Sequence, residues 1–221
     1  MAHRWFLGAS LSDQMSARIA IINYGMGNLR SVENALRKVG AAPKIVTAPS
    51  EITDVEGLVL PGVGALEDCV DGLRASKFDD FISGWIQEDR PFMGVCLGLQ
   101  ALFDVSEERN VKGLGIFPGE VVRFVSKPGL KIPHMGWNAA KLCQKGSPFW
   151  KDLADDNDRF YFVHSYYAKP ENPELILTTT DYDGVFTSSI SRSNTLACQF
   201  HPEKSQAKGL QIYSNFASIC D

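Results

Sequence analysis

The sequence predicts an α/β fold built on a mostly parallel sheet that helices flank, with antiparallel additions in the C-terminal half. Three observations lead to this prediction. Strands and helices alternate along the first half of the chain, which is typical of parallel strands joined by crossover helices. From Gly119 onward, β-rich segments and turn signals dominate. A length of 221 residues with 44% hydrophobic content fits one large domain better than two small ones.

The elements of the first half follow from the spacing of hydrophobic residues. Residues 18–24 form a nearly continuous apolar run, as in a buried strand. The next tract, 28–39, has apolar residues at the spacing of one helix face, and Gly40 ends it. We predict further strands at 44–47, 57–60 and 91–96, and further helices at 78–88 and 97–103.

The second half is predicted to extend the sheet with antiparallel or mixed strands, because turn signals such as Asp183-Gly184 separate its β-rich segments. The last tract, 205–219, has a helical pattern and begins at Ser205, a residue type that often caps a helix N-terminus. The β-rich segments are 120–125, 160–168, 175–180 and 195–200.

We divide the chain into an N-terminal extension, residues 1–16, and one domain, residues 17–221. The extension holds one arginine and a short apolar patch at 5–7. It lacks the apolar region of about 7 to 15 residues that a secretory signal needs. We therefore expect it to be a flexible arm, as chain ends often are.

Composition excludes several classes of partner. The net charge of −4 and the absence of a long lysine and arginine cluster argue against nucleic acid. No uncharged stretch approaches the roughly 18 to 20 apolar residues that span a bilayer, so we expect a soluble protein without membrane contact. The five cysteines contain no Cys-x-x-Cys pair, so neither a disulfide framework nor a zinc site is predicted. We expect a reducing cytoplasmic location, no metal and no cofactor.

A nucleophile is predicted at Cys96. Residues 94–98 have the form Gly-x-Cys-x-Gly between a predicted strand and a predicted helix, the thiol counterpart of the nucleophile elbow. Glycines are needed on both sides because side chains there would collide with the crossing strand and helix. The N-terminus of the following helix favours a thiolate. The other four cysteines are interpreted as small buried hydrophobic residues.

His201 is the predicted base. It follows the predicted strand at 195–200, and catalytic groups emerge beyond the carboxyl ends of strands in open parallel sheets. Glu203, two residues later, can accept a hydrogen bond from the imidazole and fix its tautomer, as the third member of a triad. His134 and His164 are the other candidates for the base within the predicted domain.

Two segments, GVCLGLQ at 94–100 and QFHPEKS at 199–205, resemble the class I glutamine amidotransferases, which release ammonia from the side-chain amide of L-glutamine. The resemblance implies a flavodoxin-like open sheet, with Cys96 as nucleophile, His201 as base and Glu203 as the residue that orients it. It also assigns PGVG at 61–64 to an oxyanion strand, where the backbone N–H of Val63 or Gly64 would stabilise the developing negative charge.

By the same resemblance, a group of residues holds the substrate. Glu108 would bind the ammonium group of glutamine, and the segment 164–166 would bind its carboxylate. For Glu108 the alternative is a solvated residue at a helix end. The predicted oxyanion and substrate-binding residues are Gly62, Val63, Gly64, Leu97, Gln100, Glu108, His164, Ser165 and Tyr166.

Three further segments, NYGMGNL at 23–29, PHMGWN at 133–138 and YFVHSY at 161–166, are similar to the glutaminase subunits of imidazole glycerol phosphate synthase, in histidine biosynthesis. The similarity extends over residues 18–219. It implies a heterodimer with a (β/α)8-barrel cyclase that receives the ammonia. We expect the contacts with this partner to include Asn28, Trp137, Tyr161 and Lys204.

Four other interpretations stay open at this stage. The chain could serve another acceptor, such as anthranilate, GMP, carbamoyl phosphate or pyridoxal phosphate synthesis. It could also be a non-catalytic regulatory subunit, or a cysteine hydrolase or peptidase that uses the same turn. The segment 25–28 also allows a weak phosphate-loop interpretation, but the full pattern with its lysine is absent.

Overall fold

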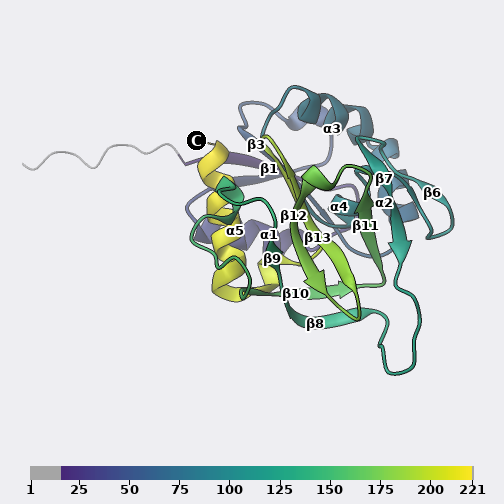
Figure 1. The fold of residues 1–221 in the computed structure, drawn as a ribbon. Coiled ribbons are helices and arrows are strands. Elements are labelled where there is room, and N and C mark those ends of the chain that lie inside the picture. The colour runs from purple at the N-terminus through teal and green to yellow at the C-terminus, as the bar shows by residue number, and fades with distance from the viewer. Residues whose placement is uncertain (1–15, 221) are drawn as a thin grey trace, which may run out of the picture.

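The computed structural model describes residues 16–220. The predicted N-terminal extension therefore lies outside the described residues, except for Ser16. Within the described range the chain is an α/β structure whose central sheet has eight strands in the order β2-β1-β3-β4-β14-β13-β12-β9 (Figure 1). No helix of residues 16–220 is long and apolar enough to cross a membrane.

The parallel part of the sheet has the order expected of a flavodoxin-like fold. Strand β1 pairs in parallel with β2 and β3, β3 with β4, and β4 with β14. If these five strands are numbered by their order along the chain, with β14 as the fifth, their order in the sheet is 2-1-3-4-5. The prediction of an open parallel sheet is therefore confirmed. These strands are β1 (Arg18–Ile22), β2 (Ala42–Val46), β3 (Gly57–Gly62), β4 (Phe92–Cys96) and β14 (Thr195–Cys198).

Antiparallel strands extend this sheet, and the pairs in two smaller sheets are antiparallel except for β5 with β7. This confirms the antiparallel or mixed strands predicted for the second half. Strands β13, β12 and β9 continue the central sheet from β14. Their bounds are β9 (Lys141–Leu142), β12 (Ile176–Asp181) and β13 (Val185–Arg192); the smaller sheets contain β8 (His134–Ala139) with β10 (Arg159–His164), and β5 (Phe103–Ser106), β6 (Val111–Lys112), β7 (Phe117–Arg123) and β11 (Tyr166–Pro170).

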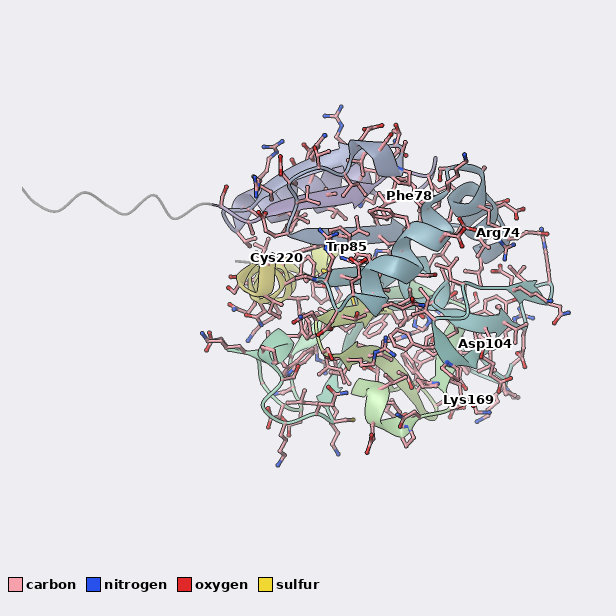
Figure 2. All side chains as sticks on the ribbon, turned by 90° about the horizontal axis from the view of Figure 1, so that it is seen from above. Arg74, Phe78, Trp85, Asp104, Lys169 and Cys220 are labelled. Atoms are coloured by element: carbon pink, nitrogen blue, oxygen red, sulfur yellow. The ribbon has the colours of Figure 1, made fainter. Side chains whose placement is uncertain are left out.

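Helices cover both faces of the central sheet (Figure 1). Val32 and Leu36 of α1 share one apolar core with Phe216 of α5, while α2 and α3 pack into a second core on the other face. Figure 2 shows Phe78 and Trp85 of α3, which are buried, and Lys169, which is exposed on β11. The helices are α1 (Leu29–Lys38), α2 (Leu66–Ala75), α3 (Phe78–Gln87), α4 (Leu97–Gln100) and α5 (Gln206–Cys220), with short 3₁₀ turns η1 (Pro49–Glu51), η2 (Pro148–Trp150), η3 (Pro173–Leu175) and η4 (Pro202–Lys204).

Two predicted elements are wrong in extent. The helix predicted at 97–103 ends at Gln100, because Phe103 begins β5 and pairs in parallel with Phe117. The strand predicted at 160–168 is two strands, since β10 pairs with β8 whereas β11 pairs with β7 in a different sheet. Ser165, between these strands, therefore marks a change of sheet.

The predicted role of Ser205 is also corrected. Helix α5 begins at Gln206, and the Ser205 hydroxyl turns back from it. This hydroxyl donates to the carbonyl oxygen of His201 at 2.6 Å and accepts from the backbone N–H of Tyr161 at 2.9 Å. The backbone N–H of His201 in turn donates to the carbonyl oxygen of Tyr161 at 2.9 Å. Ser205 thus fixes the backbone around His201 against strand β10.

Candidate active site

The turn at Cys96 is strained in the way a nucleophile elbow requires. Cys96 ends β4, precedes α4 and has φ 55°, in the region that favours glycine. A Cβ atom on Gly94 would lie 2.5 Å from the carbonyl oxygen of Gly98, and one on Gly98 would collide with the carbonyl oxygen of Leu60. The flanking glycines are therefore required by the close approach of strand and helix, as predicted.

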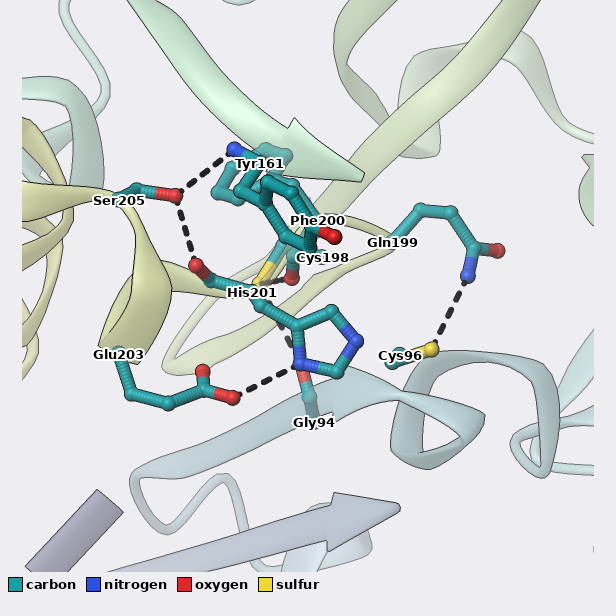
Figure 3. A network of polar contacts seen from close by, with 9 residues as sticks. All are labelled: Gly94, Cys96, Tyr161, Cys198, Gln199, Phe200, His201, Glu203 and Ser205. Atoms are coloured by element: carbon teal, nitrogen blue, oxygen red, sulfur yellow. Dashed lines mark hydrogen bonds and ion pairs between the residues drawn. The ribbon is translucent and has the colours of Figure 1, made fainter. Parts of the chain in front are cut away.

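His201 stands between Cys96 and Glu203 (Figure 3). It follows β14, and its Nδ1 lies 2.8 Å from Glu203 Oε1, with both side chains 1% exposed. Because a carboxylate accepts, this bond places a proton on Nδ1 and directs Nε2 away from Glu203. Among the described residues, Nε2 has no hydrogen-bond partner.

The electrostatics favour the protonated form of His201. Burial alone would lower the pKa of His201, but its interactions with Cys96 and Glu203 outweigh burial and raise this pKa to about 10. An imidazole with this pKa holds a proton at neutral pH. The arrangement can therefore deliver a proton to a leaving group after the sulfur attacks.

The other two histidines of the described chain are poor candidates for a base. His134 Nδ1 lies 3.1 Å from His164 Nε2, and His164 Nδ1 lies 2.7 Å from the carbonyl oxygen of Tyr166. Burial lowers the pKa of His134 to about 4 and that of His164 to about 3. Both imidazoles are therefore neutral at neutral pH and are committed to hydrogen bonds within the fold.

A cavity of about 620 Å³ opens at the carboxyl ends of the parallel strands and contains both Cys96 and His201. This is where ligands bind in open α/β sheets. Most of the predicted site residues meet there. The cavity is lined by Gly27, Asn28, Val63, Gly64, Cys96, Leu97, Gln100, Glu108, Pro133, Val163, His164, Ser165, Tyr166, His201 and Lys204.

Four predicted residues lie outside this lining. Glu203 lies next to His201, to which its carboxylate is hydrogen-bonded. Gly62 lies opposite Cys96 in the pairing of β3 with β4, and a Cβ there would be 2.6 Å from the Cβ of Leu97. Trp137 and Tyr161 are paired across β8 and β10, with ring centroids 6.3 Å apart, outside the cavity.

Glu108 is not a solvated residue at a helix end. It lies in the turn after β5, and its Oε2 accepts the backbone N–H of Leu66 at 2.9 Å, at the start of α2. This bond holds the carboxylate at the cavity wall. A negative charge there suits an ammonium group.

Gly64 also lines the cavity, in a backbone conformation that favours glycine. Gly64 has φ +100°, and a Cβ there would lie 2.5 Å from Cε of Met26. A side chain at this position would be strained because of the positive φ, and the end of the Met26 side chain would have to move. The peptide groups next to Gly64 can approach a substrate closely.

Sequence reasoning missed Gln199 as a site residue. Its side chain is fully buried, and its Nε2 lies 3.5 Å from Cys96 Sγ. The sequence did place Gln199 near the site, because it begins the segment that contains His201. A single glutamine in a strand, however, does not reveal where its amide points. Gly27, Pro133 and Val163 also line the cavity and were not among the predicted site residues.

Comparison with known proteins gives consistent results. The family model described as "Glutamine amidotransferase class-I" matches residues 20–219. A protein of Thermosynechococcus vestitus named "Imidazole glycerol phosphate synthase subunit HisH" is 49% identical over 202 residues, 91% of this chain and 96% of that protein. A protein of Nitrosococcus oceani with the same name is 48% identical over 202 residues, 90% of this chain and 95% of that one.

Solved structures agree on the fold. "Structure of PurLQS from Thermotoga maritima" superposes with a TM-score of 0.73 at 18% identity, covering 92% of this chain and 99% of that one. A second structure, described as a glutamine amidotransferase, gives a TM-score of 0.72 at 16% identity over 91% of this chain and 98% of that one. At these identities the similarity shows a shared architecture.

Proposed function

The chain belongs to the class I glutamine amidotransferases, and from this premise we propose that it is the glutaminase subunit of an imidazole glycerol phosphate synthase. It hydrolyses L-glutamine to glutamate and ammonia for a step of histidine biosynthesis. The observation that carries the proposal is that Cys96 and His201, which follow two different strands, line one cavity. The chain around them matches such subunits over about 90% of its length.

The chemistry follows from the positions of three side chains. The Cys96 thiolate attacks the side-chain carbonyl carbon of glutamine, and the carbon–nitrogen bond breaks as His201 gives a proton to the departing ammonia. A thioester to Cys96 remains. Water then attacks the thioester carbonyl while His201 takes its proton, which releases glutamate and restores the thiolate. Glu203 keeps the imidazole oriented throughout.

Backbone and polar groups would hold the substrate during these steps. The N–H groups of Val63 or Gly64, together with the Leu97 turn, would stabilise the oxyanion. Glu108 would bind the ammonium group of glutamine. Ser165 and Tyr166, with His164 behind them, would bind its carboxylate. Gln100 lines the same cavity, but its amide nitrogen is already bonded within the protein.

The proposed partner is a (β/α)8-barrel cyclase that receives the ammonia. Ammonia released into neutral water becomes ammonium, which is not a nucleophile, so production and use have to be coupled. The cyclase would convert N′-((5′-phosphoribulosyl)formimino)-5-aminoimidazole-4-carboxamide ribonucleotide to imidazole glycerol phosphate and aminoimidazole carboxamide ribonucleotide. The two subunits would work as a heterodimer in the cytoplasm, where cysteine thiols stay reduced.

Growth without histidine tests this function. A bacterial strain that lacks both synthase subunits should grow when supplied with this chain and the cyclase of the same source organism. The Cys96→Ala chain should not support growth at limiting ammonium. A strain that lacks the amidotransferase of anthranilate synthesis provides the comparison. Growth of that strain only, or of neither strain despite both proteins being present, would assign the chain to another acceptor.

Four residues in or beside the cavity, here called the rim, form a surface that suits the partner. Trp137 is 44% exposed and packs edge-to-face on Tyr161, and Lys204 Nζ lies 5.8 Å from the centroid of the Tyr161 ring. Asn28 and Lys204 also line the cavity. We propose that these four residues contact the cyclase, because tryptophan and tyrosine are enriched among binding hot spots and Asn28 and Lys204 lie next to them at the cavity.

Lys204→Ala is expected to weaken the complex about fivefold, which corresponds to roughly 1 kcal/mol for an interface side chain. It should also raise the ratio of glutamine hydrolysed to product formed. The free energy of unfolding should stay within about 0.5 kcal/mol of the unaltered chain. The measurements are a binding titration and the two product yields, with Lys169→Ala as the matched exposed lysine away from the rim. Unchanged affinity and ratio for alanine variants of all four rim residues would place the interface elsewhere.

A further inference from the structure

A buried row of side-chain amides ends on the nucleophile. Gln199 Nε2 donates to Cys96 Sγ at 3.5 Å (Figure 3). Gln100 Nε2 donates to Gln199 Oε1 at 2.9 Å and to the carbonyl oxygen of Tyr166 at 3.0 Å. Gln199 is 0% exposed and Gln100 is 3% exposed, so solvent does not compete for these bonds.

The direction of the row is fixed at its far end. The carbonyl oxygen of Tyr166 can only accept, so Gln100 has to turn its nitrogen toward it. The second hydrogen of the same nitrogen then goes to Gln199 Oε1. Gln199 must consequently present its own nitrogen, and not its oxygen, to the sulfur of Cys96. The amide orientation at the nucleophile is therefore set two side chains away.

An N–H group that points at the sulfur favours the charged thiolate over the neutral thiol. Helix α4 adds little to this effect, because it has a single turn of four residues and a correspondingly small dipole. We propose that Gln199 is a catalytic residue that stabilises the Cys96 thiolate, and that Gln100 is a positioning residue that keeps Gln199 in the donating orientation. The expected effect of these residues on glutamine hydrolysis rests on the proposed function. Their expected effect on the reactivity of the Cys96 sulfur does not.

Two substitutions of Gln199 remove its N–H donor while the size of the side chain stays nearly the same. Gln199→Met keeps the length of the side chain and removes the N–H, while Gln199→Glu replaces the nitrogen with an oxygen. Alkylation by iodoacetamide at neutral pH, followed site by site with mass spectrometry, reports the thiolate directly. We expect Cys96 to react about tenfold more slowly in Gln199→Met, more slowly still in Gln199→Glu, and with a pH profile displaced upward by about one unit in Gln199→Met.

The remaining cysteines serve as internal controls. Cys143 is exposed and reports the activity of the reagent. Cys69 and Cys198 are fully buried and, unlike Cys96, do not line the cavity, so they react only if the fold opens. Gln211→Met is the matched variant, because it removes a partly buried amide donor that bonds Asn215 at 2.9 Å, far from the elbow in sequence. Its alkylation pattern should equal that of the unaltered chain.

An unchanged rate at Cys96, with Cys69 and Cys198 still protected, overturns the proposal. If both Gln199 variants expose the buried cysteines, nitrogen-15 spectra of the glutamine side chains in the Cys143→Ala chain decide the question. Blocking Cys96 should then displace glutamine amide signals, and no displacement overturns the proposal. Alkylation needs no glutamine, so slowed alkylation together with failed growth rescue would reject the proposed function and keep the donor role.

Discussion

Replacing Cys96 with alanine is expected to lower the rate of glutamine-dependent synthesis by roughly 10⁶-fold, as loss of the nucleophile does in a catalytic triad. Synthesis from added ammonia by the complex with the cyclase should be nearly unchanged. The thiolate acts only on glutamine, whereas supplied ammonia reaches the cyclase directly. The measurement is product formation by the reconstituted complex with each nitrogen source.

Cys143→Ala is the matched control for this experiment. Cys143 is an exposed free thiol that lies outside the cavity, so its removal should leave both rates unchanged. An equal loss of the glutamine-dependent and ammonia-dependent rates in Cys96→Ala would contradict the assignment of Cys96 as the nucleophile. Such a result would indicate damage to the complex.

The isolated chain should hydrolyse glutamine slowly, and the cyclase with its nucleotide ligand should raise this rate by about 10² to 10³. That factor is the usual effect of one oxyanion donor. The physical reason is the strand end at Val63, where Gly64 at φ +100° allows the neighbouring peptide groups to exchange orientation. A partner can then favour the orientation that directs an N–H group toward the oxyanion.

Steady-state release of glutamate tests this expectation in three samples: the chain alone, the chain with cyclase, and the chain with cyclase and ligand. The second sample is the control, because it separates docking from ligand binding. Full activity of the chain alone would show that the oxyanion donors are already in place. The stimulation would then need a different cause.

The sequence predicted the parallel part of the fold and the triad because both depend on short-range patterns. Gly94 and Gly98 flank Cys96 within one turn, and Glu203 follows His201 by two residues. The same reasoning overextended the helix that begins at Leu97, because residues 97–103 are apolar or small apart from Gln100 and are uniformly buried. That helix ends because Phe103 enters β5 and pairs with Phe117 of β7, a contact that the local pattern at 97–103 does not record.

Other features depend on contacts that no local pattern records. Helix α2 was not predicted, although Leu66, Cys69, Val70 and Leu73 have the spacing of a buried helix face. The break at Ser165 is set by the two different strands that β10 and β11 meet. The amide of Gln199 is likewise oriented by groups 33 and 99 residues away along the chain, as the numbering of Tyr166 and Gln100 shows.

The row of hydrogen bonds that ends at Cys96 also restricts how the sequence can vary. At the Tyr166 carbonyl it meets a second row, in which Asn138 contacts His134 and His134 contacts His164. Gln199, His134 and His164 each accept on one side and donate on the other, Gln100 donates on both sides, and the Tyr166 carbonyl oxygen accepts on both. A change of one side chain therefore leaves an unsatisfied buried atom on the next. Substitutions along this path are therefore expected to be inherited together. If this constraint operates, related chains that differ at position 100 should also differ at position 199.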